Sequence, residues 1–136
     1  MITEQDRTVA ITIDGEEYAL LLTTRATKAI SQRYGGLDKL GEKLMQADSF
    51  ELALDEIIWL IVLMANQSIQ IFNLRNKGNA KPLLTEEEVE LLTVPSELAS
   101  FKPAIMEAMI RGTRRNVESD DTDAKNPEAG EQISLV

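Results

Sequence analysis

The sequence predicts an α+β fold that is mostly α-helical, in which an N-terminal β-hairpin packs on four to five helices. Two apolar runs around an Asp-Gly pair predict the hairpin, and apolar residues at helical spacing follow it. The chain has 136 residues, 43% of them hydrophobic, which is the length of one domain with a real core. We assign the globular domain to residues 1–115 and a disordered acidic tail to residues 116–136.

The hairpin is predicted over residues 8–22. The run TVAITI alternates, so Val9, Ile11 and Ile13 share one face, and Asp14-Gly15 then marks a tight turn. The run EYALLL, residues 17–22, is the returning strand. A two-stranded hairpin is marginally stable alone, so we expect its apolar face to lie on helices.

Three helices follow the hairpin in the predicted order. Thr23 or Thr24 caps the first, which ends at Gly35-Gly36. The second covers residues 37–46. The third, over residues 50–75, is the longest and is the central helix of the domain; Asn76 to Gly78 ends it.

The remaining helices are marked by capping residues and prolines. Thr85 heads a capping box with Glu88, and that helix ends near Leu92. Another helical segment starts at Pro95. Pro103 either begins its main helix, which continues toward Arg115, or kinks it.

The predicted core is formed by apolar residues that recur at strand or helix spacing. They are Ile11, Ile13, Leu20, Leu22, Ile30, Leu40, Leu44, Leu54, Ile57, Ile58, Ile61, Met64, Ile105 and Met109.

The central helix lacks a continuous polar face. Its polar residues fall in one arc, the predicted solvent stripe: Glu51, Asp55, Asn66, Gln70 and Asn73. Four apolar residues fall in the same arc: Leu52, Trp59, Val62 and Leu63. The middle of the helix is therefore apolar all round, which is typical of a helix buried on every side.

Two arrangements would bury that arc. The hairpin and the C-terminal helix of the same chain would cover both faces, or a second subunit or a partner would cover Leu52, Trp59, Val62 and Leu63. Tryptophan is enriched at interface hot spots, which favours the second arrangement. We take these four residues as the candidate partner-binding surface.

A second candidate patch is the basic cluster Arg111, Arg114 and Arg115 near the end of the last predicted helix. Arginines there interact favourably with the helix dipole, which is a structural role. The alternative is docking of the acidic tail or of an acidic partner.

Composition removes several function classes. The chain has neither cysteine nor histidine, so thiolate metal sites and histidine-based catalysis are excluded. The net charge of −9 argues against binding of nucleic acid through phosphate contacts. No phosphate-binding or metalloprotease motif occurs. We expect no enzyme activity, no cofactor and no metal.

Signals for secretion or membrane insertion are also missing from the sequence. The N-terminal segment MITEQDRTVA is polar and acidic, and the longest apolar run, Ile57 to Ala65, is about half of the 18 to 20 residues that a membrane span requires. We therefore expect a soluble protein, and the absence of cysteine fits a reducing cytoplasm.

The order of these elements resembles a known family. A hairpin containing DGEEYAL, the segment TTRATKAISQRYGGLDKLGEKL and a long apolar helix are similar to tail assembly chaperones of long-tailed bacteriophages and prophages. The matching stretches are Ile11 to Leu22, Ile30 to Leu44 and Ile57 to Ile71, within residues 8–112.

The resemblance implies a non-enzymatic role in the cytoplasm of a bacterial host. Such chaperones are mostly helical and self-associate, coat the long tape-measure protein before the tail tube polymerises around it, and help to recruit tail-tube subunits. A bare apolar tape measure would aggregate, and a coat of acidic subunits would keep it soluble. The alternative is another phage structural or adaptor protein, for head–tail connection or tail completion, that remains in the particle. An acidic regulatory protein is a third class, disfavoured because the negative charge is concentrated in the tail.

Overall fold

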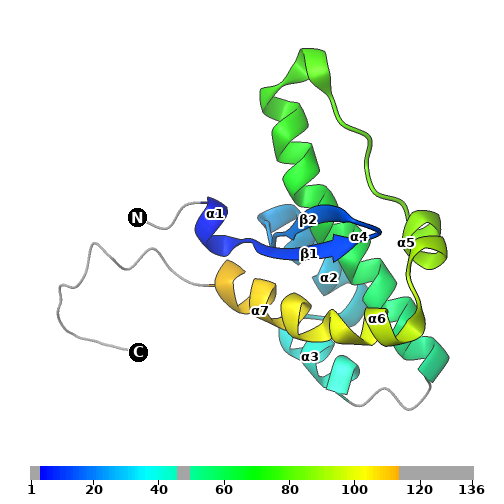
Figure 1. Ribbon diagram of the computed structural model, residues 1–136. Coiled ribbons are helices and arrows are strands. Elements are labelled where there is room, and N and C mark those ends of the chain that lie inside the picture. The colour runs from blue at the N-terminus through cyan, green and yellow to red at the C-terminus, as the bar shows by residue number, and fades with distance from the viewer. Residues whose placement is uncertain (1–3, 46–49, 114–136) are drawn as a thin grey trace, which may run out of the picture.

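The computed structural model describes residues 4–45 and 50–113, and the predicted tail over 116–136 lies outside them (Figure 1). A hairpin and a set of helices make up the fold, so the prediction of a mostly helical α+β fold is confirmed. The elements are α1 (Glu4–Arg7), β1 (Val9–Ile13), β2 (Glu16–Leu20), α2 (Thr24–Tyr34), α3 (Leu37–Met45), α4 (Phe50–Arg75), a 3-10 turn η1 (Lys77–Asn79), α5 (Glu86–Leu92), α6 (Pro95–Ser100) and α7 (Lys102–Gly112).

The hairpin closes through the predicted Asp-Gly turn. Asp14 has φ 52° and Gly15 has φ 81°, the positive values that a tight two-residue hairpin turn requires. β1 and β2 pair antiparallel, from Ile13 opposite Glu16 to Val9 opposite Leu20. The returning strand ends earlier than the predicted residue 22.

The chain leaves the hairpin ladder after Leu20 because it turns onto the central helix. The N–H of Leu21 donates to the carbonyl of Met64, 3.1 Å away, and Ser68 Oγ donates to the carbonyl of Ala19 at 2.9 Å. These bonds tie β2 directly to α4.

The predicted ends of α2 are confirmed. Thr23 Oγ1 accepts from the N–H of Ala26 at 3.0 Å, which is the N-cap bond. At the other end Gly35 has φ 94°, and its N–H donates to the carbonyl of Ser31. A left-handed residue after the last turn is the usual helix stop, and glycine adopts it without strain.

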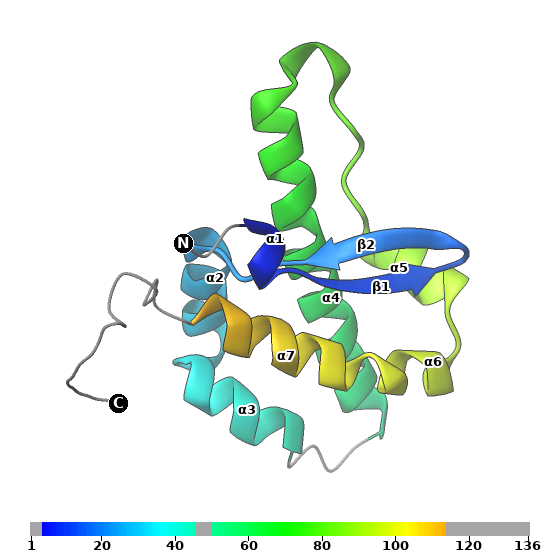
Figure 2. The same cartoon turned by 60° about the vertical axis from the view of Figure 1, so that its left-hand side comes forward.

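α4 is the central element, as predicted, and covers residues 50–75. β2, α2, α5, α6 and α7 all contact it. Figure 2 shows α7 alongside the hairpin, and α3 lies at the end of the fold away from the last turns of α4.

The predicted core is largely confirmed. Each predicted core residue whose side chain is described is buried, except Leu54, which is partly buried. The side chain of Leu44 lies outside the described ones. Nine further apolar residues that the prediction missed are buried: Leu21, Ala26, Leu60, Ala65, Leu84, Val89, Leu98, Phe101 and Ala108.

The last turns of α4 and the chain returning from them extend beyond the rest of the fold (Figures 1 and 2). We call this part, residues 66–85, the arm. Asn66 Oδ1 accepts from the N–H of Leu84 at 2.7 Å, and its Nδ2 donates to the carbonyl of Leu84 at 2.8 Å. Asn73 makes the same pair of bonds with Lys81, at 2.7 and 2.9 Å. Two side-chain amides thus fasten the returning segment to the helix.

The predicted solvent stripe is wrong at Asn66, which is buried. The helical arc that contains it faces the returning segment rather than water. A buried amide is stable there because both of its polar atoms have partners.

The C-terminal helices begin where their capping residues predict. Thr85 and Glu88 form the capping box, with 2.9 Å between the N–H of Thr85 and Glu88 Oε1. Pro95 opens α6. Pro103 lies in the first turn of α7, so it begins a new helix rather than kinking one. The short helix α1 was not predicted.

Within the described residues, one helical stretch, Ala53–Arg75, is long and apolar enough to cross a membrane by length and composition. In the fold it is the core helix, and it carries the polar residues Asn66, Gln67 and Ser68 in hydrogen bonds to neighbouring elements or to its own backbone. A buried core helix passes the same test of length and composition.

Candidate partner-binding surface

The four residues predicted to meet a partner lie on the middle of α4. Trp59, Val62 and Leu63 are partly buried and pack against the core, so the chain itself covers part of each. The side chain of Leu52 lies outside the described ones. Each of these three side chains is therefore neither fully buried nor fully exposed.

Trp59 belongs to a cluster with residues of α2. Its ring meets that of Tyr34 edge to face, with centroids 5.9 Å apart and 75° between planes. The guanidinium of Arg33 lies 4.5 Å from the centroid of the Trp59 ring. Both contacts are of the favourable aromatic and cation–π kinds. Helix α2 therefore covers one flank of Trp59.

The same cluster supplies polar partners for the buried carboxylate of Glu56. Glu56 is only 5% exposed. It accepts a hydrogen bond from the hydroxyl of Tyr34, and Arg33 Nε lies 3.4 Å from its Oε1. A buried charge is expensive unless it is paired, so these two partners explain how Glu56 is tolerated beside the core.

Arg111, from the second candidate patch, is engaged within the chain. Its Nε lies 2.8 Å from Glu107 Oε2, one turn earlier on α7, and its Nη1 donates to the carbonyl of Thr8 at 2.7 Å. Arg111 thus joins the end of α7 to the start of β1. Arg114 and Arg115 lie outside the described residues.

Exposed apolar side chains recur in one stretch of the chain that sequence reasoning missed. Among the described residues, six large hydrophobic side chains are exposed, and five of them lie between residues 74 and 94. We call these five the apolar rim: Leu74, Leu83, Leu91, Leu92 and Val94, with exposed fractions of 43 to 75%. The sixth is Ile110 on α7.

Local sequence signals for the apolar rim do exist. Leu83 and Leu84 are neighbours in an extended segment, where successive side chains point opposite ways. Because Leu84 is buried, Leu83 faces solvent. In α5, Val89 is buried against the core, which leaves Leu91 on the far side of the helix.

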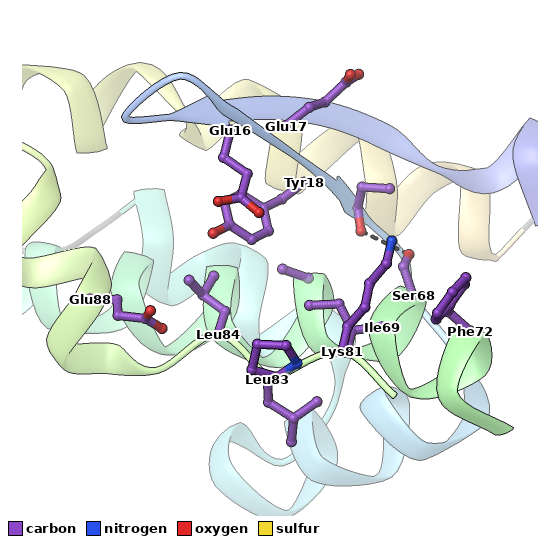
Figure 3. A pocket seen from close by; sticks show the side chains of 13 residues that line it. Glu16, Glu17, Tyr18, Ser68, Ile69, Phe72, Lys81, Leu83, Leu84 and Glu88 are labelled. Carbon is purple, nitrogen blue, oxygen red and sulfur yellow. Dashed lines mark hydrogen bonds between the residues drawn. The ribbon is translucent and has the colours of Figure 1, made fainter. Parts of the chain in front are cut away.

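A cavity of about 380 Å³ lies between β2, α4 and the returning segment of the arm (Figure 3). We call it the strand-edge groove. Its floor is apolar and is formed by Ala65, Ile69 and Phe72 of α4. One wall is β2 and the other is residues 81–84. A volume of this size is at the lower end of the roughly 300–1,000 Å³ range of ligand sites.

The two ends of the strand-edge groove differ in charge. Glu16, Tyr18 and Glu88 lie at one end, where Glu16 and Tyr18 hang from β2 into the cavity (Figure 3). Burial, reinforced by the negative charge of Glu16, raises the pKa of Tyr18. At the other end, Lys81 Nζ lies 4.2 Å from the centroid of the Phe72 ring.

The described residues contain no group of three or more acidic side chains placed to hold a metal ion. The surfaces described above offer apolar contact, hydrogen bonding and charge, which are the means of binding another protein. Comparisons with protein-family models, with curated proteins and with solved structures gave no match.

Proposed function

We propose that this chain is a non-enzymatic assembly chaperone of a long-tailed phage or prophage, which binds and solubilises the tape-measure protein and helps to recruit tail-tube subunits. The observation that carries the proposal is the apolar rim. Five large hydrophobic side chains are exposed within 21 consecutive residues, and exposed apolar side chains are available for contact with another protein.

The placement of the apolar rim agrees with this role. Leu74 and Leu83 belong to the arm, and Leu91, Leu92 and Val94 follow it in α5 and the loop to α6. An arm that extends from the fold can reach a groove or helix on a long partner without moving the core. The net charge of −9 would keep a complex of many copies soluble.

The resemblance of residues 8–112 to tail assembly chaperones supplies the identity of the partner. The physical argument supplies only its chemistry, which is a long helical protein with an apolar surface. Trp59, Val62 and Leu63 remain candidate contacts, because each keeps part of its surface exposed.

Co-expression with the long helical protein encoded downstream tests the proposal. We expect the tagged chain to co-purify with it, with many copies per long chain by light scattering. The double variant Leu74→Asp with Leu91→Asp should lose the complex, because both side chains are exposed, both changes put charge on the apolar rim, and neither residue lines the strand-edge groove.

Ile110→Asp is the matched control, since Ile110 is exposed outside the apolar rim. A downstream protein that is soluble alone and does not bind this chain would refute the proposal. Detection of the chain in finished particles would favour the structural or adaptor alternative.

A further inference from the structure

The outer edge of β2 carries backbone groups that the hairpin does not use. Ile13 and Glu16 flank the turn and are the first hydrogen-bonded pair, and such pairs alternate along an antiparallel ladder. Tyr18 and Leu20 therefore bond to β1, whereas the N–H and C=O groups of Glu17 and Ala19 point outward.

Only part of this edge is bonded to α4. The carbonyl of Ala19 accepts a hydrogen bond from Ser68 Oγ of α4, which agrees with a carbonyl that points away from β1. Within the described part of the chain, the N–H of Ala19 and both backbone groups of Glu17 have no hydrogen-bond partner. An unpaired strand edge is a template for another strand.

The strand-edge groove lies beside this free edge. Its apolar floor can receive side chains from one face of an added strand, because every second side chain of a strand points the same way. Glu16 and Glu88 make one end acidic. We propose that the groove binds an extended segment of a partner protein, which adds a strand to the edge of β2 and places a lysine or arginine between Glu16 and Glu88.

The charge of each possible occupant of the groove indicates which one would bind there. Residues 116–136 of the chain itself contain six acidic residues and one basic residue, so the acidic end of the groove repels them. A second copy pairing through β2 would bring Glu16 and Glu17 of both strands close together, and like charges across a ladder destabilise it. A basic segment of a different protein has neither penalty.

The inference deepens the proposed function, because it names the chemistry of a segment that the partner would present. It rests on the free edge of β2, which lies outside the apolar rim, although Leu83 belongs both to the rim and to the wall of the groove. The two can therefore fail separately: binding of a defined peptide tests the groove, and co-purification tests the chaperone role.

The probe is a blocked synthetic peptide of sequence Val-Thr-Val-Thr-Lys, in which both valines and the lysine point to the same face of a strand, titrated into the isotope-labelled full chain. We expect NMR shifts at the amides of Glu17 and Ala19. The peptide with glutamate in place of lysine should bind at least about threefold more weakly, since the acidic end repels it. Equal binding of the two peptides would overturn the charge argument.

Two substitutions at Glu17 separate strand addition from other binding. Glu17→Pro removes the outward N–H at an edge position, where proline is tolerated, and should abolish the shifts at Ala19. Glu17→Gln is the matched control: it keeps the N–H, and its side chain points away from the groove (Figure 3). Unchanged binding by Glu17→Pro would refute strand addition.

A second variant keeps the test decisive if Glu17→Pro does not fold. Glu16 and Glu88 are exposed, and Glu16→Gln with Glu88→Gln removes both charges. Glutamine at position 88 still completes the capping box with Thr85, so the fold should be retained. We expect weaker binding of the lysine peptide and stronger binding of the glutamate peptide, because the substitutions remove both the attraction and the repulsion. Lysine-peptide binding as strong as that of the unmodified chain would refute the acidic site.

Discussion

The two asparagines of the arm allow the effect of burial on a hydrogen bond to be measured within one protein. Asn66 and Asn73 each make the same two bonds to a backbone segment, with distances of 2.7 to 2.9 Å. Leu84, the partner of Asn66, is 4% exposed, whereas Lys81, the partner of Asn73, is exposed. Alanine substitution removes the same groups at both sites.

The two substitutions should have different costs. Asn66→Ala leaves a buried N–H and a buried C=O without partners, at about 1–3 kcal/mol each, so we expect a loss of about 2–6 kcal/mol. Water replaces the amide at Asn73→Ala, so its cost should be about 1 kcal/mol or less. The gain in helix propensity from alanine, roughly 0.7 kcal/mol, is common to both and cancels in the comparison.

Urea unfolding followed by circular dichroism measures both losses. At about 4 °C per kcal/mol, the melting temperature of Asn66→Ala should lie several degrees below that of Asn73→Ala. Equal losses, within about 0.5 kcal/mol, would show that the segment at Leu84 is hydrated in solution and that the burial argument is wrong.

Three further predictions concern stability. The pKa of Tyr18 is raised above the value of 10.0 that it has in the unfolded chain, so the folded chain holds the phenol proton more tightly. This stabilisation is present below pH 10 and is lost as pH rises through the folded pKa. The urea midpoint should therefore fall less between about pH 9 and 11 in Tyr18→Phe than in the unmodified chain. Tyr34→Phe removes a donor to buried Glu56 and should cost about 1–3 kcal/mol by urea unfolding, together with a change in the fluorescence of Trp59, the single tryptophan; a loss near zero would mean that water reaches Glu56. A Cβ at position 112 would lie 2.5 Å from the Cβ of Leu22, so Gly112→Ala should cost about 1–3 kcal/mol in melting experiments, and less in a Leu22→Ala background; additive costs would contradict the close approach.

Local signals explain the elements that the sequence predicted well. Thr23, Gly35 and the Thr85–Glu88 capping box each act within one turn of the chain, so their residue types are enough to place helix ends. The Asp14-Gly15 turn is local in the same way. The hydrophobic period then places Ile57, Ile61 and Met64 in the core.

Long-range contacts explain what the sequence did not predict. Asn66 has the polarity of a surface residue, and only the return of residues 81–84 along α4 makes it a buried one. The strand-edge groove likewise forms only where β2, α4 and the arm come together, and no spacing of residues in the sequence predicts that contact. Leu91 is exposed because the opposite face of α5, which carries Val89, packs against the core.

The paired asparagines also constrain how the arm can change in length. Seven helical residues rise about 10.5 Å, and three extended residues span about 10 Å, so the steps from Asn66 to Asn73 and from Leu84 back to Lys81 match. Inserting one residue into either side would put the amides out of register with the backbone groups they bind. Homologous chains should therefore lengthen or shorten this arm in coupled units, two helical turns against three residues, and the length of the arm would take discrete values about 10 Å apart.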